Sequence, residues 1–227
     1  MFTHFEPSLM QFLRDLAANN DREWFNAHKQ DYEEKVRTPA LAFIEAMEPW
    51  IRMVSPHYEA SAKKVGGSLM RVYKDVRFSK DKAPFKTNVG IQFRHEVGKD
   101  VHAPGFYLHI EPQEIFLGVG TWHPDPLALK AIREHIEAKP GPYQDAIEHA
   151  PFKEIYAMAG DSLIRPPKGY DANHPLIDEI KRKDFIAICK LTEAELCEGD
   201  FCQLVASRFG RAQPLQKFIC EALGLRF

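Results

Sequence analysis

The chain has 227 residues, of which 44% are hydrophobic and 27% are charged, proportions that are ordinary for a globular protein. This length is ample for a buried core that needs no disulfide or metal to hold it together. The formal net charge of −2 at pH 7 argues against binding nucleic acid through the charge of the whole chain, and no apolar run is long enough to span a membrane.

The N-terminus and the cysteines favour a cytoplasmic protein. Residues 1–7 have neither the basic stretch nor the apolar stretch of a secretory signal. The four cysteines form no Cys-x-x-Cys pair and lie among apolar residues: Cys189, Cys197, Cys202 and Cys220. Unpaired, buried thiols are typical of a reducing compartment, so we expect no disulfide framework and no metal site.

Apolar residues at helical spacing predict helices between about residues 6 and 55. The first is expected to begin near Pro7, because proline suits the first turn of a helix. Another is expected to begin at Thr38-Pro39. Pro49 is expected to kink or end that helix, because proline cannot donate the backbone hydrogen bond of a helix interior.

The apolar period changes to two, the period of a β-strand, between about residues 68 and 120. Four runs alternate in this way, at about 70–78, 89–94, 106–111 and 115–120. Pro112-Gln113 predicts a turn that pairs Ile110 with Ile115. Four strands joined by short connections indicate an antiparallel, meander-like sheet.

Helical spacing returns at about residues 125–224. Asp125-Pro126 is typical of a helix start, and Thr192 with Glu195 matches the pattern of a capping box. We therefore expect an α+β fold, with helices from both ends of the chain packed on one face of the sheet. We expect residues 1–227 to form a single domain.

The most unusual segment is residues 71–88, which carries six basic and two acidic residues, a local charge of +4 in a chain of net charge −2. A cationic cluster on an acidic protein indicates a place for an anion. If the four strands pair as expected, one sheet face carries much of it: Arg71, Tyr73, Asp75, Arg77, Gln92, Arg94, Tyr107, His109 and Glu111. Gly118 and Gly120 share this face and would leave room for a ligand.

Candidate residues follow from this face and from two neighbouring loops. The ligand-binding candidates are Arg71, Arg77, Lys80, Lys82, Lys86, Arg94, Tyr107, Arg165 and Lys168, because guanidinium and ammonium groups bind phosphate and carboxylate oxygens. The candidates for proton transfer are His109, Tyr73, Asp75 and Glu111. The chain shows no complete catalytic signature, so the sequence leaves open whether it is an enzyme, and no cofactor can be named.

A purely structural interpretation of the same residues stays open. Exposed sheet faces are normally polar, and Arg–Asp pairs across strands contribute modestly to sheet stability, a role that Asp75, between Arg71 and Arg77, would also fit. Lys80 and Lys82 fit a solvated loop equally well. The proline-rich loop that carries Arg165 and Lys168 either closes over the sheet face or simply connects two helices.

Three functions are compatible with the basic cluster. The first is binding, or chemical conversion, of an anionic small molecule that carries phosphate or carboxylate. The second is a protein-interaction module in which the basic loop at residues 79–88 contacts an acidic protein surface. The third, single-stranded nucleic-acid binding, is disfavoured by the net charge.

Several motifs of the chain resemble one family over nearly its full length. They are Asn19-Asn-Asp-Arg-Glu-Trp-Phe25, the segment from Arg71 to Asn88 with Arg-Phe-Ser-Lys-Asp-Lys in it, Tyr107-Leu-His-Ile-Glu111, Gly118-Val-Gly-Thr-Trp122 and Arg165-Pro-Pro-Lys-Gly-Tyr-Asp171. Together they are similar to the bacterial and fungal family known as domain of unknown function 2461. The resemblance implies one intact domain, and it implies no particular reaction, cofactor or catalytic residue.

Overall fold

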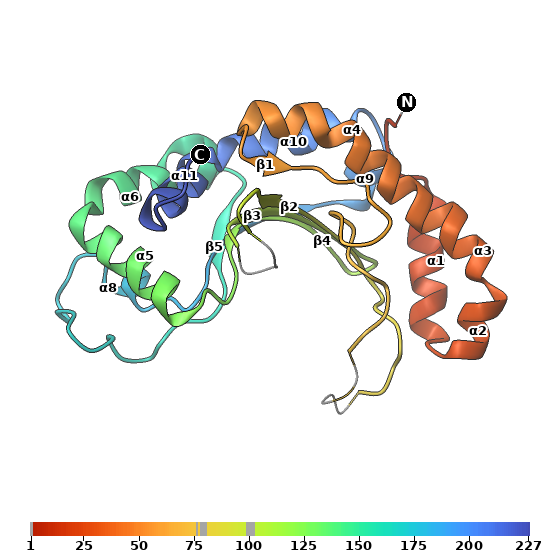
Figure 1. The fold of residues 1–227 in the computed structure, drawn as a ribbon, viewed down its shortest axis with the longest axis horizontal. Helices are drawn as coiled ribbons and strands as arrows, with labels where there is room; N and C mark the ends of the chain where they lie inside the picture. The colour runs from red at the N-terminus through yellow and green to blue at the C-terminus, as the bar shows by residue number, and fades with distance from the viewer. Residues whose placement is uncertain (1, 76, 78–80, 99–102) are drawn as a thin grey trace.

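The computed structural model describes residues 2–75, 77, 81–98 and 103–227, and its centre is an antiparallel sheet (Figure 1). Within these residues the sheet has six strands in the order β1-β2-β3-β4-β6-β5. The strands are β1 (Tyr58–Glu59), β2 (Val89–His95), β3 (Gly105–Glu111), β4 (Glu114–Thr121), β5 (Ala157–Ala159) and β6 (Phe185–Leu191). Sheet and helices together confirm the α+β class.

The sequence predicted about four strands, and three of them are confirmed as β2, β3 and β4, including the pairing of Ile110 with Ile115. The prediction of a strand at 70–78 is wrong for its described part, where isolated bridges pair Leu69 with Ile91 and Tyr73 with Phe85. The nitrogen of Lys74 donates to the oxygen of Pro84, but proline has no N–H to return, so the ladder is interrupted.

The strands β5 and β6 lie in the part of the chain that was predicted to be helical. The apolar run of β6 from Phe185 to Cys189 is almost continuous, and periodicity alone does not separate such a run from a buried helix. The second half of the chain is therefore only partly helical.

Twelve helical segments are present among the described residues. They are α1 (Pro7–Ala18), α2 (Arg22–Ala27), α3 (Lys29–Tyr32), the π-helical turn η1 (Glu33–Arg37), α4 (Thr38–Val54), α5 (Pro126–Ala138), α6 (Pro140–Glu148), α7 (Ala150–Lys153), α8 (Ile177–Ile180), α9 (Glu193–Cys197), α10 (Phe201–Arg211) and α11 (Gln213–Ala222). The starts predicted at Pro7, Thr38 and Asp125-Pro126 are confirmed. None of these helices has both the length and the apolar character needed to cross a membrane.

Pro49 was predicted to kink or end its helix, and it does not end it, because α4 continues to Val54. Pro49 and Glu45 both lie on the exposed side of α4, so water can reach the carbonyl that the proline leaves without a donor. Burial of Met47 and Ile51 on the other side holds the helix together past the proline.

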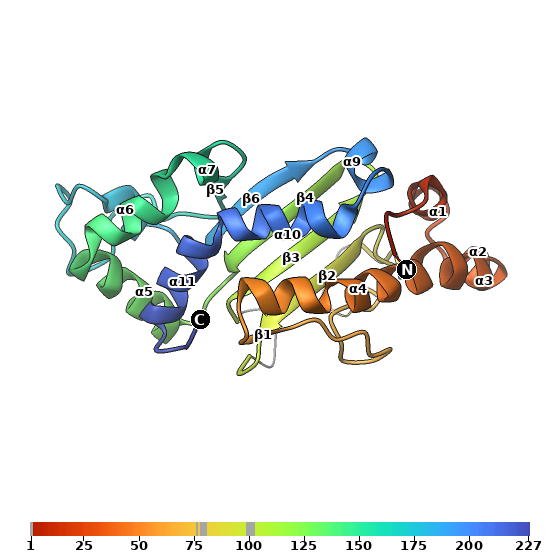
Figure 2. The same ribbon diagram turned by 90° about the horizontal axis from the view of Figure 1, so that it is seen from above.

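Helices α4 and α10 cover one face of the sheet (Figures 1 and 2). The contact is rich in aromatic rings, with centroids 6.3 Å apart for Phe43 and Phe93 and 4.8 Å apart for Phe106 and Phe209. Figure 1 shows the sheet as an arch below these two helices, flanked at its ends by α1–α3 and by α5 and α6. The opposite face, which bears Gln92, Tyr107 and His109, is called the open face below.

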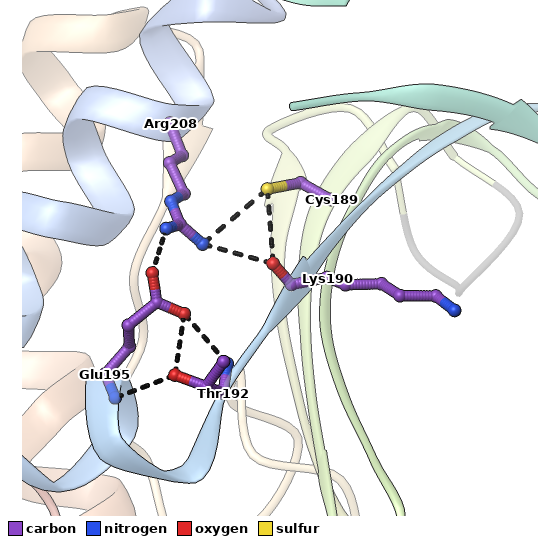
Figure 3. Close-up of polar contacts among 5 residues, drawn as sticks. All are labelled: Cys189, Lys190, Thr192, Glu195 and Arg208. Carbon is purple, nitrogen blue, oxygen red and sulfur yellow. Dashed lines mark hydrogen bonds and ion pairs between the residues drawn. The ribbon is translucent and has the colours of Figure 1, made fainter. Parts of the chain in front are cut away.

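A polar network fixes the C-terminal helices to β6 (Figure 3). The guanidinium of Arg208 on α10 pairs with the carboxylate of Glu195 and donates to the carbonyl of Lys190 at 3.2 Å. Thr192 caps α9, since its Oγ1 accepts from the nitrogen of Glu195 at 3.1 Å while the Glu195 carboxylate accepts from the nitrogen of Thr192 at 2.8 Å. This confirms the predicted capping box.

Replacing Thr192 with alanine should lower the free energy of unfolding by about 1 kcal/mol, because the first turn of α9 loses its cap. Urea denaturation of both proteins measures the difference. Thr38→Ala is the matched control, since Thr38 also opens a helix but makes no side-chain cap within the described chain. Equal losses in the two variants would contradict a specific role for the capping box.

Candidate functional site

Two pockets adjoin each other beside the open face. The first, which we call the basic pocket, has a volume of about 610 Å³ and lies between the helices from Phe25 to Arg37 and the segment at 64–73. The second, which we call the sheet pocket, has a volume of about 480 Å³ and lies over β2, β3, β4 and β6. Met70, Lys86 and Gln92 line both pockets, so the two lie side by side.

The basic pocket is strongly cationic. Its basic lining residues are Lys29, Arg37, Lys64, Arg71, Lys86 and Arg94, against the single acidic residue Glu33. Two of the arginines are held by the protein itself. Arg37 pairs with Glu33 at 2.9 Å across the π-helical turn, and Arg94 donates to the carbonyl of Gly67 at 3.1 Å.

Lys86 and Arg71 differ from these two arginines. Within the residues that the structure describes, neither of their side chains has a hydrogen-bond or ion-pair partner. Lys86 is half-buried; this burial lowers the pKa of its ammonium group, and the nearby Arg71 guanidinium lowers it further. The charge of Asp75 acts on Arg71, but neither cation is in an ion pair, and two such neighbouring cations are suited to an anion that contacts both.

The register of the sheet builds the floor of the sheet pocket. One row across β2, β3, β4 and β6 consists of Gln92, Tyr107, Gly118 and Ile188, and the next consists of Arg94, Gly105, Gly120 and Ile186. The glycines expose bare backbone, and the surrounding wall is mostly apolar, from Met70, Phe116, Trp122, Ile186 and Ile188. A concave apolar surface with a few polar groups is typical of small-molecule sites.

Gly118 and Gly120 are there for different reasons. Gly120 has φ of +122°, and a Cβ there would lie 2.0 Å from the carbonyl oxygen of Phe185, so the fold itself requires glycine. Gly118 has no such φ, and its Cβ would meet Tyr107 at an ordinary 3.6 Å. Because the fold would tolerate a side chain at Gly118, its glycine serves to keep the space above the floor free.

A chain of hydrogen bonds runs along the edge of the sheet pocket through His109. The hydroxyl of Tyr107 lies 3.1 Å from His109 Nδ1, and His109 Nε2 lies 3.3 Å from the carboxylate of Glu111. The hydroxyl of Thr87 donates to the other Glu111 oxygen at 2.6 Å. The imidazole stacks on Phe116, with centroids 4.8 Å apart and planes 9° apart, which fixes the plane of the ring.

The neighbours of His109 select one tautomer. The amide nitrogen of Asn88, 3.4 Å from Nδ1, and the Tyr107 hydroxyl are both donors, so Nδ1 accepts while Nε2–H donates to Glu111. Burial, and secondarily the charge of Glu111, raise the pKa of Tyr107 to about 12, so its hydroxyl stays protonated at neutral pH. The chain Tyr107–His109–Glu111 can carry a proton between the pocket and a partly exposed carboxylate.

Among the predicted residues, the structure brings Arg71, Lys86 and Arg94 together in the basic pocket, and Tyr107 and His109 together in the sheet pocket. Tyr73 lines the basic pocket, where it packs on Phe85 with centroids 5.3 Å apart. The roles of these residues stay predictions.

The remaining predicted residues lie elsewhere. Arg77 pairs with Asp75 at 2.6 Å and lowers the pKa of that carboxyl group to about 2, so Asp75 holds no proton to donate at neutral pH. Lys82 is exposed, and Lys80 lies outside the described residues. Arg165 and Lys168 are exposed on a loop whose Tyr170 is influenced by charges on α5, and neither lines the basic pocket or the sheet pocket.

Several lining residues were not predicted. Trp122 continues the alternation of Gly118 and Gly120 by one step, so the sequence held a signal for it. Ile186 and Ile188 could not be placed without β6, and nothing in the sequence brings Lys29 of α3 to the site. In the described part of the chain, no three His, Cys, Asp or Glu side chains are grouped so that they could hold a metal ion.

Lys86→Met should raise the free energy of unfolding at pH 7, because the charge that folding partly buries is removed while the side chain keeps a similar length. In the wild type, the charge of Lys86 destabilises the folded state fully at any pH below its lowered folded-state pKa. This destabilisation disappears as the pH rises to 10.5, the ordinary pKa of lysine, so the extra stability of Lys86→Met should shrink towards that pH. Urea denaturation at pH 7 and at higher pH measures it.

The control for this prediction is Lys130→Met, which removes a lysine whose pKa is raised by its hydrogen bond to Glu134. This variant should be no more stable than the wild type. A Lys86→Met protein that is less stable than the wild type at pH 7 would show that the ammonium group has a stabilising partner.

Gly120→Ala should lower the free energy of unfolding by about 1–3 kcal/mol or more, because the backbone is strained and the new Cβ meets the Phe185 carbonyl. Gly118→Ala should change it by less than about 0.5 kcal/mol, since its Cβ makes ordinary contacts. Urea midpoints of the two variants test the assignment, and a Gly118→Ala protein as unstable as Gly120→Ala would refute it.

The comparison with protein families identifies the family of the chain. A family model described as conserved hypothetical protein (DUF2461) matches residues 8–218, a range that includes the strands β1–β6 and the lining residues of both pockets. No curated protein matches the sequence. The chain therefore belongs to the conserved hypothetical protein family DUF2461.

Proposed function

We propose that the protein binds an anionic small molecule, bearing phosphate or carboxylate, between Lys86 and Arg71. The observation that carries this proposal is the half-buried Lys86 ammonium beside the Arg71 guanidinium, with neither side chain in a hydrogen bond or ion pair among the described residues; the charge of Asp75 acts on Arg71 without pairing with it. Such an arrangement is unfavourable in the unliganded protein, and groups held at a cost in stability are typical of binding sites. A bound anion would relieve the repulsion.

The shape of the site supports a small molecule as the ligand. Lys86 lies where the basic pocket meets the sheet pocket, and the two volumes of about 610 and 480 Å³ fall in the range of metabolite sites. His109 lines the second pocket, so a ligand held at Lys86 would lie next to the Tyr107–His109–Glu111 chain. This places an acid–base group beside the proposed ligand.

The protein-interaction alternative has weaker support. Two of the cations on the basic segment are neutralised within it, since Lys74 pairs with Asp81 at 2.8 Å and Arg77 with Asp75 at 2.6 Å. Both pairs are largely exposed. These pairs reduce the charge offered to an acidic protein surface or to single-stranded nucleic acid.

We further propose that the protein is cytoplasmic and folds as a single domain. All four cysteines are free, and Cys189, Cys202 and Cys220 are buried, as expected in a reducing compartment. One hydrophobic cluster includes residues of α1, α4, the sheet and α10, which supports a shared core.

The binding proposal is tested by thermal unfolding with a panel of inorganic phosphate, sugar phosphates, nucleotides and carboxylates. An anion at about 100 times its Kd should add about 2.7 kcal/mol of stability. This should raise the midpoint by roughly 5–10 °C for a chain of this size. The shift should disappear in Lys86→Met and in Arg71→Gln, because the anion loses one of its two cations.

Lys130→Met is the matched control, since it removes the same charge from an exposed site on α5 and should keep the full shift. A shift that survives in Lys86→Met would place the anion elsewhere. A panel that leaves the wild-type midpoint unchanged would also contradict the proposal.

A further inference from the structure

We propose that the ligand carries, besides its anionic group, a flat aromatic ring that lies in the sheet pocket against Gly118 and Trp122. This inference rests on the proposed anion site at Lys86 and extends it by naming the class of ligand. Four features of the sheet pocket support it: its floor, its platform at Trp122, its wall and its connection to Lys86.

Glycines line the floor where a ring would lie. Gly105 pairs with Gly120 and Tyr107 pairs with Gly118, so three glycines of two neighbouring strands adjoin one another. Gly118 is not required by the backbone or by its neighbours, as its Cβ would make contacts of 3.6 Å or more. Backbone without side chains lets a planar group approach the sheet closely.

Trp122 is a built platform at the rim of the sheet pocket. Its side chain is 48% exposed, and its indole stacks on His123 with centroids 4.1 Å apart. His123 has φ of +47°, a strained value for a residue other than glycine. The buried carboxylate of Asp184 holds it there by accepting from the His123 nitrogen and pairing with its Nδ1, both at 2.8 Å.

The strained residue, His123, directly follows the exposed Trp122. A strained residue persists when surrounding contacts enforce it, and such residues cluster at ligand sites. The Asp184 carboxylate, 2% exposed, also accepts from the nitrogen of Asp161 at 2.8 Å, so it is anchored independently of Trp122. The network therefore fixes His123, on which the indole of Trp122 stacks at the rim of the sheet pocket, and an aromatic rim residue suits contact with another ring.

The wall of the sheet pocket favours an aromatic ring over a sugar. Met70, Phe116, Ile186 and Ile188 supply apolar contacts and no hydrogen-bond partners for hydroxyl groups. The polar lining residues Lys86, Gln92, Tyr107 and His109 are few and can engage substituents of the ring. A volume of about 480 Å³ holds a bicyclic ring together with one anionic group.

The connection through Lys86 determines the order of groups on the ligand. Lys86 lines both pockets, so an anion bound to it lies at the boundary between them. A ring attached directly to that anion, or by a short linker, would reach the glycine floor. The geometry thus points to a compact aryl phosphate or aryl carboxylate.

Isothermal titration calorimetry with matched probes tests this inference. The probes are inorganic phosphate, n-butyl phosphate, 1-naphthyl phosphate and 1-naphthoate, the last to separate phosphate from carboxylate recognition. We expect 1-naphthyl phosphate to bind at least about 10-fold more tightly than inorganic phosphate, and more tightly than n-butyl phosphate, because the ring buries apolar surface in the pocket.

Two variants remove the ring site independently. Gly118→Val fills the floor, and Trp122→Ala removes the platform. Each variant should reduce the ratio of the affinities for 1-naphthyl phosphate and inorganic phosphate by about 10-fold. The affinity for inorganic phosphate alone reports on the anion site at Lys86 and Arg71. Gly210→Ala is the control, since a Cβ at this glycine of α10 meets nothing within 4 Å. It should keep the full advantage.

The outcomes separate the two proposals. If inorganic phosphate binds and depends on Lys86, but the naphthyl ring adds no affinity, the ring site is refuted and the anion site stands. If the advantage of the ring persists in both Gly118→Val and Trp122→Ala, the ring binds elsewhere and the inference is also refuted. If no probe binds, both proposals fail together.

Discussion

The structure depends on the antiparallel register of β2, β3, β4 and β6, which assigns alternate residues to opposite faces of one sheet. Phe93 and Phe106 point towards α4 and α10 and bury their rings, which fixes the register, because a slip of one residue would expose them. Their neighbours along the strands must then lie on the open face. Tyr107, Gly118 and Ile188 come together there as a consequence of packing on the other side.

His109 and Lys86 come from different kinds of structure. His109 sits on a central strand, and its ring is held by Phe116, Glu111 and Tyr107, so its orientation is set by a rigid scaffold. Lys86 belongs to the irregular segment beside β2, where isolated bridges replace a ladder. A long side chain there reaches both pockets, which a residue in a regular edge strand could not do as freely.

The sequence revealed the parts of this arrangement that depend on local periodicity. Alternation placed β2, β3 and β4 and hence Tyr107 and His109, because each strand has one apolar and one polar side. Alternation failed to predict β6, because its apolar residues from Phe185 to Cys189 are not interrupted by polar ones. It also failed at residues 70–75, where Pro84 interrupts the backbone hydrogen bonds of the ladder, which the side-chain pattern does not show. The cluster of basic residues predicted Arg71 and Lys86 as ligand-binding residues, but it predicted Arg77 in the same way. The ion pair between Arg77 and Asp75 became visible only in the structure.

Lys86 lines both pockets, so in the proposed site its charge would act on both parts of a ligand. A ligand without a negative group would leave the ammonium near Arg71 uncompensated and would add the desolvation of that charge to the cost of binding. An anion without an apolar group would leave the surface between Gly118 and Trp122 in water. Each kind of incomplete ligand therefore lacks one contribution, and discrimination arises from the demand for both at once. In the proposed site, Lys86 is the charged residue among the three that line both pockets, so a ligand is expected to need an anionic and an apolar group together.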